Sequence, residues 1–599
     1  MSPPGRPKGE FRSAQHEGSR VSTSLPQPAP AACGVATLAD IEAFERAAPL
    51  ETRLPAGGVW AMLEAAGDRH ADRPALSFLP HGDPREPAQT WTHGQLLMQC
   101  RRLANWLHAL GVRPPAGVAV LLPNLPQTYV ALFGSQAAAV VCPISPTLGA
   151  GAVAGILLAG GCGVLVTEGP VQNPALWQRA CDAAALAPGL RHVLAVGGTG
   201  GRDSAGMPAG VQVHDFELAC ASQRGDRLDF SPPQDPQSPT ARFHTGGTTG
   251  APKLATHTQR NQVYLAWCMA EMVGFSPNDV VLIGLPLFHV HAVIPLSMGP
   301  LSRGAHLVLL GPQGFRHASV VQGFWRIVER FGATCFSAVP TVYAGLLQVD
   351  MAGARVNSLR VVFSGSAPLA RQVALDVQAR TGLVILEGYG LTEGTCISSL
   401  SPLRGERRIG SIGLRLPYQA MKVARLDAQG HWLADCAPGE TGHLLISGPN
   451  VFAGYADAAQ TAAAFAAPGW LDTGDLGHCD VDGYFWISGR AKDLIKRSGH
   501  SIDPQGLEEA LHADPAIAMA AVVARPDARA GEVPVAFVSL KPGAQADPAR
   551  LLADCRVRLG DPVAAPVQLT VLQQLPLTAV GKLDKVALRA LAAADNTPE

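Results

Sequence analysis

The sequence predicts an α/β protein with a large N-terminal domain of parallel and mixed sheets covered by helices, followed by a small α+β C-terminal domain. Three observations predict this class. Hydrophobic residues make up 47% of the 599 residues, which is enough to bury a large core. Short apolar runs alternate with helical segments from about residue 90 to 490, as in parallel sheets covered by helices. After Gly489 the residue composition changes, with five charged residues among positions 490–497.

The chain is predicted to divide into three parts. Residues 1–33 are rich in Pro, Ser and Gln and lack the apolar stretch of a secretory signal, so we expect a flexible tail there. Residues 34–489 are expected to form the large domain and residues 490–599 the small one. The boundary is placed after Gly489 because glycine and clustered charges are typical of a linker between domains.

Individual elements follow from the apolar pattern and its period. In the large domain, strands are expected at 117–122, 140–145, 163–167, 280–285, 306–310, 334–338, 360–363 and 383–386. Helices are expected there at 129–139, 149–159 and 318–331. In the small domain, helices are expected at 504–512, 548–559 and 585–592, and strands at 519–524, 533–540 and 568–572.

Residues 114–167 form a run of 54 positions without Asp, Glu, Lys, Arg or His. Pro123, Pro126, Pro143, Pro146 and many glycines interrupt it, which favours buried parallel strands and their helices over membrane-spanning helices. We therefore expect no integral membrane span. The 12 cysteines are scattered and form no CxxC pair, which is typical of reduced thiols in a cytoplasmic protein.

The charge balance argues against nucleic acid as a partner. Lys and Arg number 47, Asp and Glu number 48, and the net charge is −1. A protein that grips phosphate backbones normally carries a basic excess, and one that stacks on bases is rich in aromatic residues. Aromatic residues make up only 6% of this chain.

The strongest motif spans residues 245–253 and reads Thr-Gly-Gly-Thr-Thr-Gly-Ala-Pro-Lys. Its glycines allow backbone N–H groups to converge, and its hydroxyls and lysine add donors and a positive charge. This combination suits a polyphosphate. The motif is no Walker A loop, because no Gly-Lys-Ser/Thr occurs at the required spacing.

Five further motifs follow in order, and each is short. They are Gly365-Ser366-Ala367-Pro368-Leu369, Gly388-Tyr389-Gly390-Leu391-Thr392-Glu393, Trp470-Leu471-Asp472-Thr473-Gly474-Asp475, Gly489-Arg490-Ala491-Lys492-Asp493 and Gly581-Lys582. Together with the first motif, the set resembles the adenylate-forming superfamily of AMP-binding enzymes, in its acyl-CoA synthetase (fatty-acid–CoA ligase) type. The resemblance covers about residues 50–595 and implies a C-terminal domain that is mobile.

The resemblance implies roles around the nucleotide. Tyr389 stacks on adenine, Asp475 accepts hydrogen bonds from the ribose hydroxyls, and Arg490 adds a ribose or phosphate contact. Thr392 holds the α-phosphate, and Glu393 is the ligand for Mg²⁺. The residues so assigned to ATP and AMP are Thr245, Gly246, Gly247, Thr248, Thr249, Gly250, Lys253, Ser366, Ala367, Pro368, Gly388, Tyr389, Gly390, Thr392, Asp475 and Arg490.

The implied reaction has two steps and uses ATP, Mg²⁺ and coenzyme A. A carboxylate attacks the α-phosphorus to form an acyl-adenylate and pyrophosphate, and a thiol then displaces AMP. The catalytic residues that the resemblance assigns are Lys582, Glu393 and Thr248, with Lys582 facing the charge that develops in the first step. The C-terminal domain then rotates about Lys492 as a hinge. This rotation brings Lys496, Ser498 and Gly499 to the coenzyme A side.

The acid partner is expected to be a hydrophobic carboxylic acid, and most readily a fatty acid. His289, within the segment 286–291, and Val339 with Pro340 resemble the acyl-pocket motifs of acyl-CoA synthetases. His289 either gates that pocket or is a simple packed histidine. Relatives that activate amino acids place an Asp near residues 288–295, and none occurs here. The chain length of the acid cannot be read from the sequence.

Two other functions are compatible with these motifs. One is an acyl-AMP ligase that hands its acyl group to a carrier protein in trans, since no carrier domain follows on this chain. The other is a non-catalytic nucleotide-binding relative. The sequence also departs from the family pattern at three positions, with Gly246 in place of the common Ser, Leu254 in place of Gly and Gly506 in place of Glu.

Overall fold

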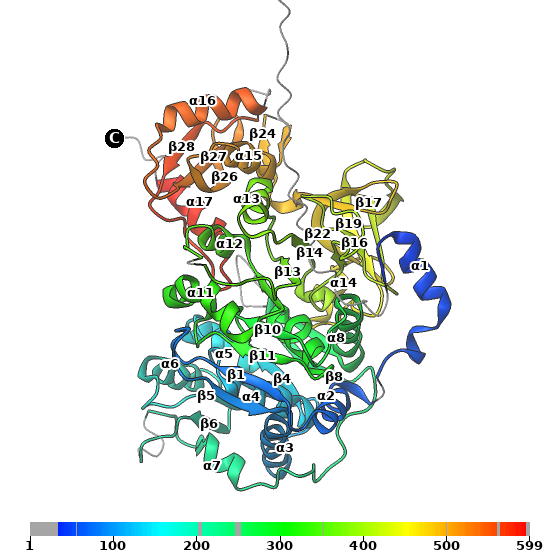
Figure 1. The fold of residues 1–599 in the computed structure, drawn as a ribbon, viewed down its shortest axis with the longest axis vertical. Helices are drawn as coiled ribbons and strands as arrows, with labels where there is room; N and C mark the ends of the chain where they lie inside the picture. The colour runs from blue at the N-terminus through cyan, green and yellow to red at the C-terminus, as the bar shows by residue number, and fades with distance from the viewer. Residues whose placement is uncertain are drawn as a thin grey trace, which may run out of the picture.

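The computed structural model describes residues 34–55, 57–201, 206–245, 253–351, 353–498, 500–559 and 564–594. The expected tail over residues 1–33 lies outside the described residues. The described chain forms a large N-terminal part built on three β-sheets and a smaller C-terminal part built on a fourth (Figure 1). The α/β class with a smaller second domain is therefore confirmed.

The first sheet has nine strands, and its interior is parallel while both edges are antiparallel. Its strands are β1 (Pro74–Phe78), β2 (Gln89–Thr92), β10 (Val280–Ile283), β11 (His306–Leu309), β12 (Cys335–Ala338), β13 (Val361–Ser364), β14 (Ile385–Tyr389), β15 (Ser399–Leu400) and β16 (Leu414–Arg415). They lie in the order β16-β15-β14-β13-β12-β10-β11-β1-β2.

The second sheet has eight strands and is parallel from β8 to β7. Its strands are β3 (Gly117–Leu121), β4 (Val140–Pro143), β5 (Cys162–Glu168), β6 (His192–Val196), β7 (Gln212–Asp215), β8 (Pro239–Thr245), β9 (Lys253–Thr258) and β20 (Gly454–Tyr455). They lie in the order β20-β9-β8-β4-β3-β5-β6-β7.

The third sheet is antiparallel throughout its described pairs and corrects one prediction. Its strands are β17 (Ala420–Leu426), β18 (Trp432–Asp435), β19 (Gly442–Ser447), β21 (Phe465–Ala467), β22 (Trp470–Cys479) and β23 (Phe485–Arg490). The sequence predicted that strands and helices alternate as far as about residue 490. That prediction is wrong after residue 414, because these strands pair antiparallel and only the short helix α14 (Ala458–Ala462) lies between them in the described chain.

The C-terminal part packs helices against a five-stranded sheet. Its strands are β24 (Ile495–Arg497), β25 (His500–Ile502), β26 (Ile517–Asp527), β27 (Gly531–Leu540) and β28 (Gln568–Val571). Its helices are α15 (Pro504–His512), α16 (Pro548–Leu559) and α17 (Lys585–Ala594). This part lies next to α12 and α13 of the N-terminal part (Figure 1).

The helices of the N-terminal part cover the faces of its parallel sheets. They are α1 (Leu38–Ala47), α2 (Gly58–Arg69), α3 (His93–Ala109), α4 (Pro126–Ala138), α5 (Ala150–Ala159), α6 (Pro174–Ala185), α7 (Phe216–Ala221), α8 (Gln259–Val273), α9 (Val290–Val293), α10 (Gly299–Leu301), α11 (Ala318–Phe331), α12 (Pro340–Leu346), α13 (Arg371–Thr381) and α14 (Ala458–Ala462). Short irregular turns are η1 (Leu50–Thr52), η2 (Ile294–Met298), η3 (Gly314–Arg316), η4 (Thr392–Gly394) and η5 (Ala491–Asp493).

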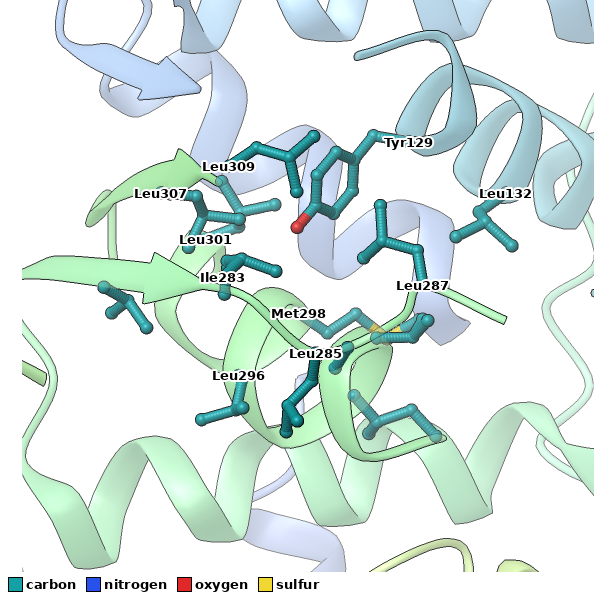
Figure 2. Close-up of a cluster of buried hydrophobic side chains, with 14 of the residues drawn as sticks. Tyr129, Leu132, Ile283, Leu285, Leu287, Leu296, Met298, Leu301, Leu307 and Leu309 are labelled. Atoms are coloured by element: carbon teal, nitrogen blue, oxygen red, sulfur yellow. The ribbon is translucent and has the colours of Figure 1, made fainter. Parts of the chain in front are cut away.

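The first two sheets share one core, to which α4 contributes. Tyr129 and Leu132 of α4 lie among side chains of the first sheet and of the helical turns after β10 (Figure 2). The Tyr129 hydroxyl is 2.9 Å from Ser297 Oγ, which gives the buried phenol a polar partner. The cluster drawn with them includes Ile283, Leu285, Leu287, Leu296, Met298, Leu301, Leu307 and Leu309.

Most of the uncharged run over residues 114–167 is buried or half-buried, and it forms parallel strands and their helices, as predicted. It supplies β3, β4, β5 and the helices α4 and α5, and the side chains of β3 and β4 are all buried. Among the described residues, no helix combines the length and the apolar character that crossing a membrane requires.

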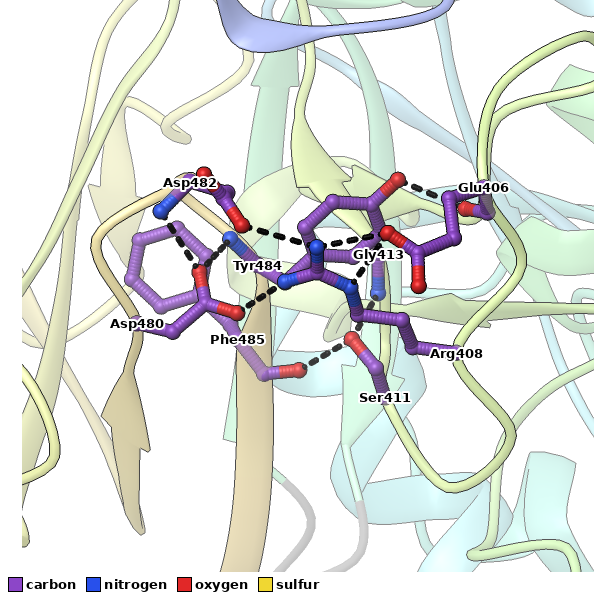
Figure 3. A network of polar contacts seen from close by, with 8 residues as sticks. All are labelled: Glu406, Arg408, Ser411, Gly413, Asp480, Asp482, Tyr484 and Phe485. Atoms are coloured by element: carbon purple, nitrogen blue, oxygen red, sulfur yellow. Dashed lines mark hydrogen bonds and ion pairs between the residues drawn. The ribbon is translucent and has the colours of Figure 1, made fainter.

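A polar network ties the loop after β15 to the turn between β22 and β23 (Figure 3). The Arg408 guanidinium pairs with Glu406, Asp480 and Asp482, and its Cζ lies 4.2 Å from the centre of the Tyr484 ring. Since β22 and β23 carry two of the predicted nucleotide-binding residues, this network helps to hold those strands in place.

Candidate active site

The motif over residues 245–253, the predicted phosphate loop, connects two paired strands. Thr245 ends β8, Lys253 begins β9, and the two residues face each other in the antiparallel register. The candidates between them lie outside the described residues: Gly246, Gly247, Thr248, Thr249 and Gly250. The described ends place this loop at the carboxyl end of β8, the edge where ligands bind in parallel α/β sheets.

The motif over residues 365–369, which the family resemblance assigns to adenine binding as the adenine loop, lies beside the motif over residues 388–393. Residues 366–368 follow β13, while Gly388 and Tyr389 end the adjacent parallel strand β14. Because the carboxyl ends of parallel strands meet at one edge of a sheet, Ser366, Ala367 and Pro368 lie next to Tyr389. Gly390 must be glycine here, because a Cβ at this position would lie 1.5 Å from the Cys396 carbonyl oxygen.

Tyr389, Asp475 and Arg490 form one hydrogen-bonded group. The Tyr389 hydroxyl donates to Asp475 Oδ2 at 2.7 Å, and Arg490 Nε lies 3.0 Å from Asp475 Oδ1. Asp475 on β22 and Arg490 on β23 face each other in the strand register. Burial raises the pKa of Asp475, and the adjacent Arg490 guanidinium opposes that rise. The sequence predicted a ribose-binding carboxylate but not its hydroxyl partner.

A second group links Glu393 to Lys253 through a residue that the sequence analysis missed. The Tyr455 hydroxyl donates to Glu393 Oε1 at 2.6 Å, and Lys253 Nζ lies 5.0 Å from the centre of the Tyr455 ring. Tyr455 is on β20, which pairs with β9 beside the phosphate loop. A hydrogen bond also fixes the backbone at Thr392, whose carbonyl oxygen lies 2.7 Å from His257 Nε2. No motif marked Tyr455 or His257, since only strand pairing and folding bring them here.

Lys582 lies in a tight turn that reaches the N-terminal part. The Gly581 N–H donates to the Thr578 carbonyl at 2.9 Å, and the Lys582 N–H donates to Thr578 Oγ1 at 3.1 Å. From the other side, the Thr341 hydroxyl donates to the Gly581 carbonyl at 2.9 Å. Burial lowers the pKa of Lys582 to about 8; Arg490 adds to this lowering and Asp475 opposes it. The lysine ammonium therefore lies within the field of the Tyr389–Asp475–Arg490 group.

The predicted acyl-pocket residues surround the same turn. Val339 and Pro340 begin α12, and a Cβ on Gly581 would lie 3.2 Å from Val339 Cγ2. His289 is half-buried, and its pKa is well below the ordinary value because of burial and the nearby Lys582 charge. The structure thus brings His289, Val339 and Lys582 together from segments far apart in the sequence.

The predicted hinge lies between two firmly held residues. On one side, Arg490 is paired in β23 with Asp475. On the other, Asp493 is bound to Arg589 of α17 at 2.6 Å. Lys492 lies exposed in η5 between them, and its neighbour Ala491 is half-buried.

The predicted coenzyme A-side residues belong to the C-terminal sheet. The Lys496 N–H donates to Glu532 Oε2 at 2.7 Å, and the Ser498 N–H donates to the Ala530 carbonyl at 2.8 Å. Both Lys496 and Ser498 are exposed, and Ser498 has a left-handed φ of 49°. Gly499 lies outside the described residues.

Comparisons with known proteins fit this geometry. The AMP-binding enzyme family model matches residues 63–456, and the model of the AMP-binding enzyme C-terminal domain matches residues 506–582. The chain is 38% identical over 561 residues to a marinolic acid–CoA ligase of Pseudoalteromonas sp. (strain SANK 73390), covering 93% of this chain and 84% of that protein. It is 30% identical over 557 residues to a long-chain-fatty-acid–CoA ligase of Bacillus subtilis (strain 168), covering 89% and 94%.

The fold also matches a solved structure. A crystal structure of an anthranilate CoA ligase in complex with anthranoyl-AMP superposes with a TM-score of 0.78 at 24% identity, covering 91% of this chain and 99% of that one. At this identity the likeness concerns the fold. Taken with the family models and the sequence relatives, the chain belongs to the AMP-binding enzyme family and is an adenylate-forming acid–thiol ligase.

Proposed function

We propose that the chain is an AMP-forming acyl-CoA synthetase that activates a hydrophobic carboxylic acid, most readily a fatty acid, with ATP and coenzyme A. The observation that carries the proposal is the burial of Lys582 beside the Tyr389–Asp475–Arg490 group. Packing alone gives no reason for the charged side chain of Lys582, which comes from a second and mobile domain, to be buried at this position. It suits a reaction in which negative charge develops at the α-phosphate.

In the first step the acid's carboxylate oxygen attacks the α-phosphorus of ATP, and the bond to pyrophosphate breaks. Asp475 and Arg490 hold the ribose, and Tyr389 stacks on adenine, so that the α-phosphate is presented in one orientation. Lys582 stabilises the oxygens on which charge accumulates. In the second step the thiol of coenzyme A attacks the acyl carbon, AMP leaves, and the thioester forms. No protein nucleophile takes part in either step.

Glu393 fits the role of a Mg²⁺ ligand. Its Oε1 accepts one hydrogen bond from Tyr455, and a half-buried carboxylate beside the phosphate loop is the hard oxygen donor that Mg²⁺ prefers. When bound, Mg²⁺ would neutralise charge on the phosphate oxygens. Glu393 would hold the ion, and Tyr455 would orient the carboxylate.

Tyr455→Phe is expected to raise the Mg²⁺ concentration that gives half-maximal pyrophosphate release by about 3–10-fold, because the carboxylate loses its orienting hydroxyl. The phenyl ring remains, so the Lys253 contact is retained. The variant is compared with wild type by titrating Mg²⁺ at saturating ATP. The role assigned to Tyr455 is wrong if the Mg²⁺ dependence is unchanged while the thermal stability matches wild type.

We propose a hydrophobic carboxylic acid as the substrate on two grounds. First, the apolar residues Val339 and Pro340 lie beside the Lys582 turn. In addition, residues 288–295 contain no acidic side chain that would bind the α-ammonium group of an amino acid. The two sequence relatives named above are a marinolic acid ligase and a long-chain fatty acid ligase.

The deciding experiment is pyrophosphate release with ATP, Mg²⁺ and acids from acetate to palmitate plus aromatic acids, with and without coenzyme A. We expect release with medium or long aliphatic acids and a thioester product only when coenzyme A is present. Release with an adenylate that coenzyme A does not convert would favour transfer to a carrier protein. Binding of ATP without release for any acid would favour the non-catalytic alternative.

A further inference from the structure

Three histidines that the proposed mechanism does not use lie near one another, and two of them, His289 and His291, lie near Lys582. His244 precedes the phosphate loop, and His289 and His291 follow β10. Burial, together with the nearby Lys582 charge, lowers the pKa of both His289 and His291, and burial lowers that of His244 to about 4. All three rings are therefore neutral at physiological pH, and each has one N–H donor and one acceptor nitrogen.

Hydrogen bonding decides which nitrogen of His291 is the acceptor. Ser337 Oγ lies 3.0 Å from His291 Nε2 and 3.2 Å from the Phe363 carbonyl oxygen. A hydroxyl has one proton, and a carbonyl can only accept. Both contacts are satisfied when Ser337 donates to Phe363 and accepts from His291 Nε2–H. His291 Nδ1 then carries the lone pair.

The other ring nitrogen of His291, Nδ1, has no hydrogen-bond partner in the described part of the chain. His291 is 8% exposed, and Gly365 lies against its ring, since a Cβ at Gly365 would lie 3.4 Å from His291 Cε1. This acceptor nitrogen therefore belongs to a buried ring that lies beside Gly365 and within the field of Lys582.

In the other two rings, those of His289 and His244, the free nitrogen is a donor instead of an acceptor. His289 Nδ1 accepts the His291 backbone N–H at 3.3 Å, and His244 Nε2 accepts the Ser145 N–H at 3.2 Å. Their remaining nitrogens, His289 Nε2 and His244 Nδ1, are therefore donors. Donors suit the oxygens of a carboxylate, whereas the acceptor on His291 suits neither a carboxylate nor a phosphate.

We propose that His291, held in one tautomer by Ser337, is a specificity-determining residue that accepts a hydrogen bond from a neutral donor on the acyl group, so that the enzyme prefers hydroxy acids to their unsubstituted counterparts. This inference rests on the proposed acyl-CoA synthetase function. An acid without such a donor leaves the His291 lone pair desolvated and unpaired, which costs binding in the transition state.

The test compares decanoate with 2- and 3-hydroxydecanoate and with the methyl ether of each hydroxy acid. A methyl ether keeps the oxygen but cannot donate. For wild type we expect kcat/KM for pyrophosphate release to be at least about tenfold higher for one hydroxy acid than for both decanoate and its own ether. Turnover of decanoate with no hydroxy acid preferred would overturn this inference alone. No release with any acid would instead count against the proposed function.

Ser337→Ala tests the tautomer argument. Without the Ser337 acceptor, the proton of His291 is free to move to Nδ1, which then becomes a donor. We expect the preference for the hydroxy acid over its ether to fall below about threefold, with kcat/KM for decanoate nearly unchanged. Nitrogen-15 NMR of the histidine rings is expected to show the Nε2–H form of His291 in wild type and a mixture in the variant.

Tyr343→Phe is the matched control, because the Tyr343 hydroxyl donates to the same Phe363 carbonyl at 2.6 Å without contacting His291. This variant is expected to keep the wild-type preference. Equal loss of preference in Tyr343→Phe and Ser337→Ala would mean that packing around Phe363, and not the His291 tautomer, sets the specificity. A wild-type Nδ1–H tautomer in the NMR spectrum would also overturn the proposal.

Discussion

Replacing Lys582 with alanine is expected to lower the rate of pyrophosphate release by about 10²–10³-fold, because the ammonium that stabilises the developing charge is lost. Conversion of preformed acyl-adenylate to thioester is expected to stay within about threefold of wild type. The rotation about Lys492 that the motif resemblance implies would by then have taken Lys582 out of the site. The two half-reactions are measured separately, the second with synthetic acyl-adenylate and coenzyme A.

The pH dependence of the first half-reaction provides a further check on Lys582. Burial lowers the pKa of Lys582 to about 8, and only the protonated form carries the stabilising charge. Pyrophosphate release is therefore expected to fall as the pH rises through about 8. Lys582→Arg keeps its charge to much higher pH and should lose this alkaline limb. A limb that stays in place in Lys582→Arg would assign it to another group.

Lys585→Ala is the control for these variants. Lys585 is three residues away and pairs with Glu508 at 2.7 Å within the C-terminal part. Its removal is expected to leave both half-reactions within about twofold of wild type. If Lys582→Ala formed adenylate as fast as Lys585→Ala, the catalytic role of Lys582 would be refuted.

Replacing Lys492 with proline is expected to slow thioester formation by about a hundredfold while a single round of pyrophosphate release proceeds nearly as in wild type. The segment between the Asp475–Arg490 pair and the Asp493–Arg589 pair is short, so any rotation must change the dihedral angles near Lys492. Proline holds φ near −65°, which suits the 3₁₀ turn η5 seen here but resists rotation.

The comparison variant is Lys492→Ala, which removes the side chain but leaves the backbone free. Both of its half-reactions are expected to remain near wild type. Rapid-quench measurement of pyrophosphate and thioester in one experiment distinguishes the outcomes. A hinge at Lys492 is excluded if Lys492→Pro slows both half-reactions equally, or if it slows neither.

Several elements could be predicted residue by residue from the sequence. The helix expected over residues 318–331 runs over Ala318–Phe331, and those expected over 504–512 and 548–559 have the same bounds in the structure. Their ends are marked locally: Gly332 closes the first with a left-handed φ of 58°, and Asp503 caps the second by accepting the Gln505 N–H. Signals of this kind need no information from the rest of the chain.

The region after residue 414 shows where local signals fail. The strand β19 has the same kind of short apolar run as a parallel strand, whereas β17 and β22 mix apolar with polar residues, and the sequence does not state which partner each will pair with. Antiparallel pairing was decided by the packing of the whole sheet. For the same reason, Tyr455 and His257 were not predicted in the site, although both contact predicted residues.

By itself, the sequence determined the class of chemistry, since the motifs place phosphate-binding glycines, a hard carboxylate and a lysine in a set order that suits adenylate formation. It also determined that an α/β core buries the uncharged run over residues 114–167. Only the tertiary structure decided which side chains meet. Tyr389 with Asp475, Glu393 with Tyr455 and His291 with Ser337 are separated by 86, 62 and 46 residues. Contacts at such separations depend on the relative placement of whole strands and helices, which no local pattern of residues encodes.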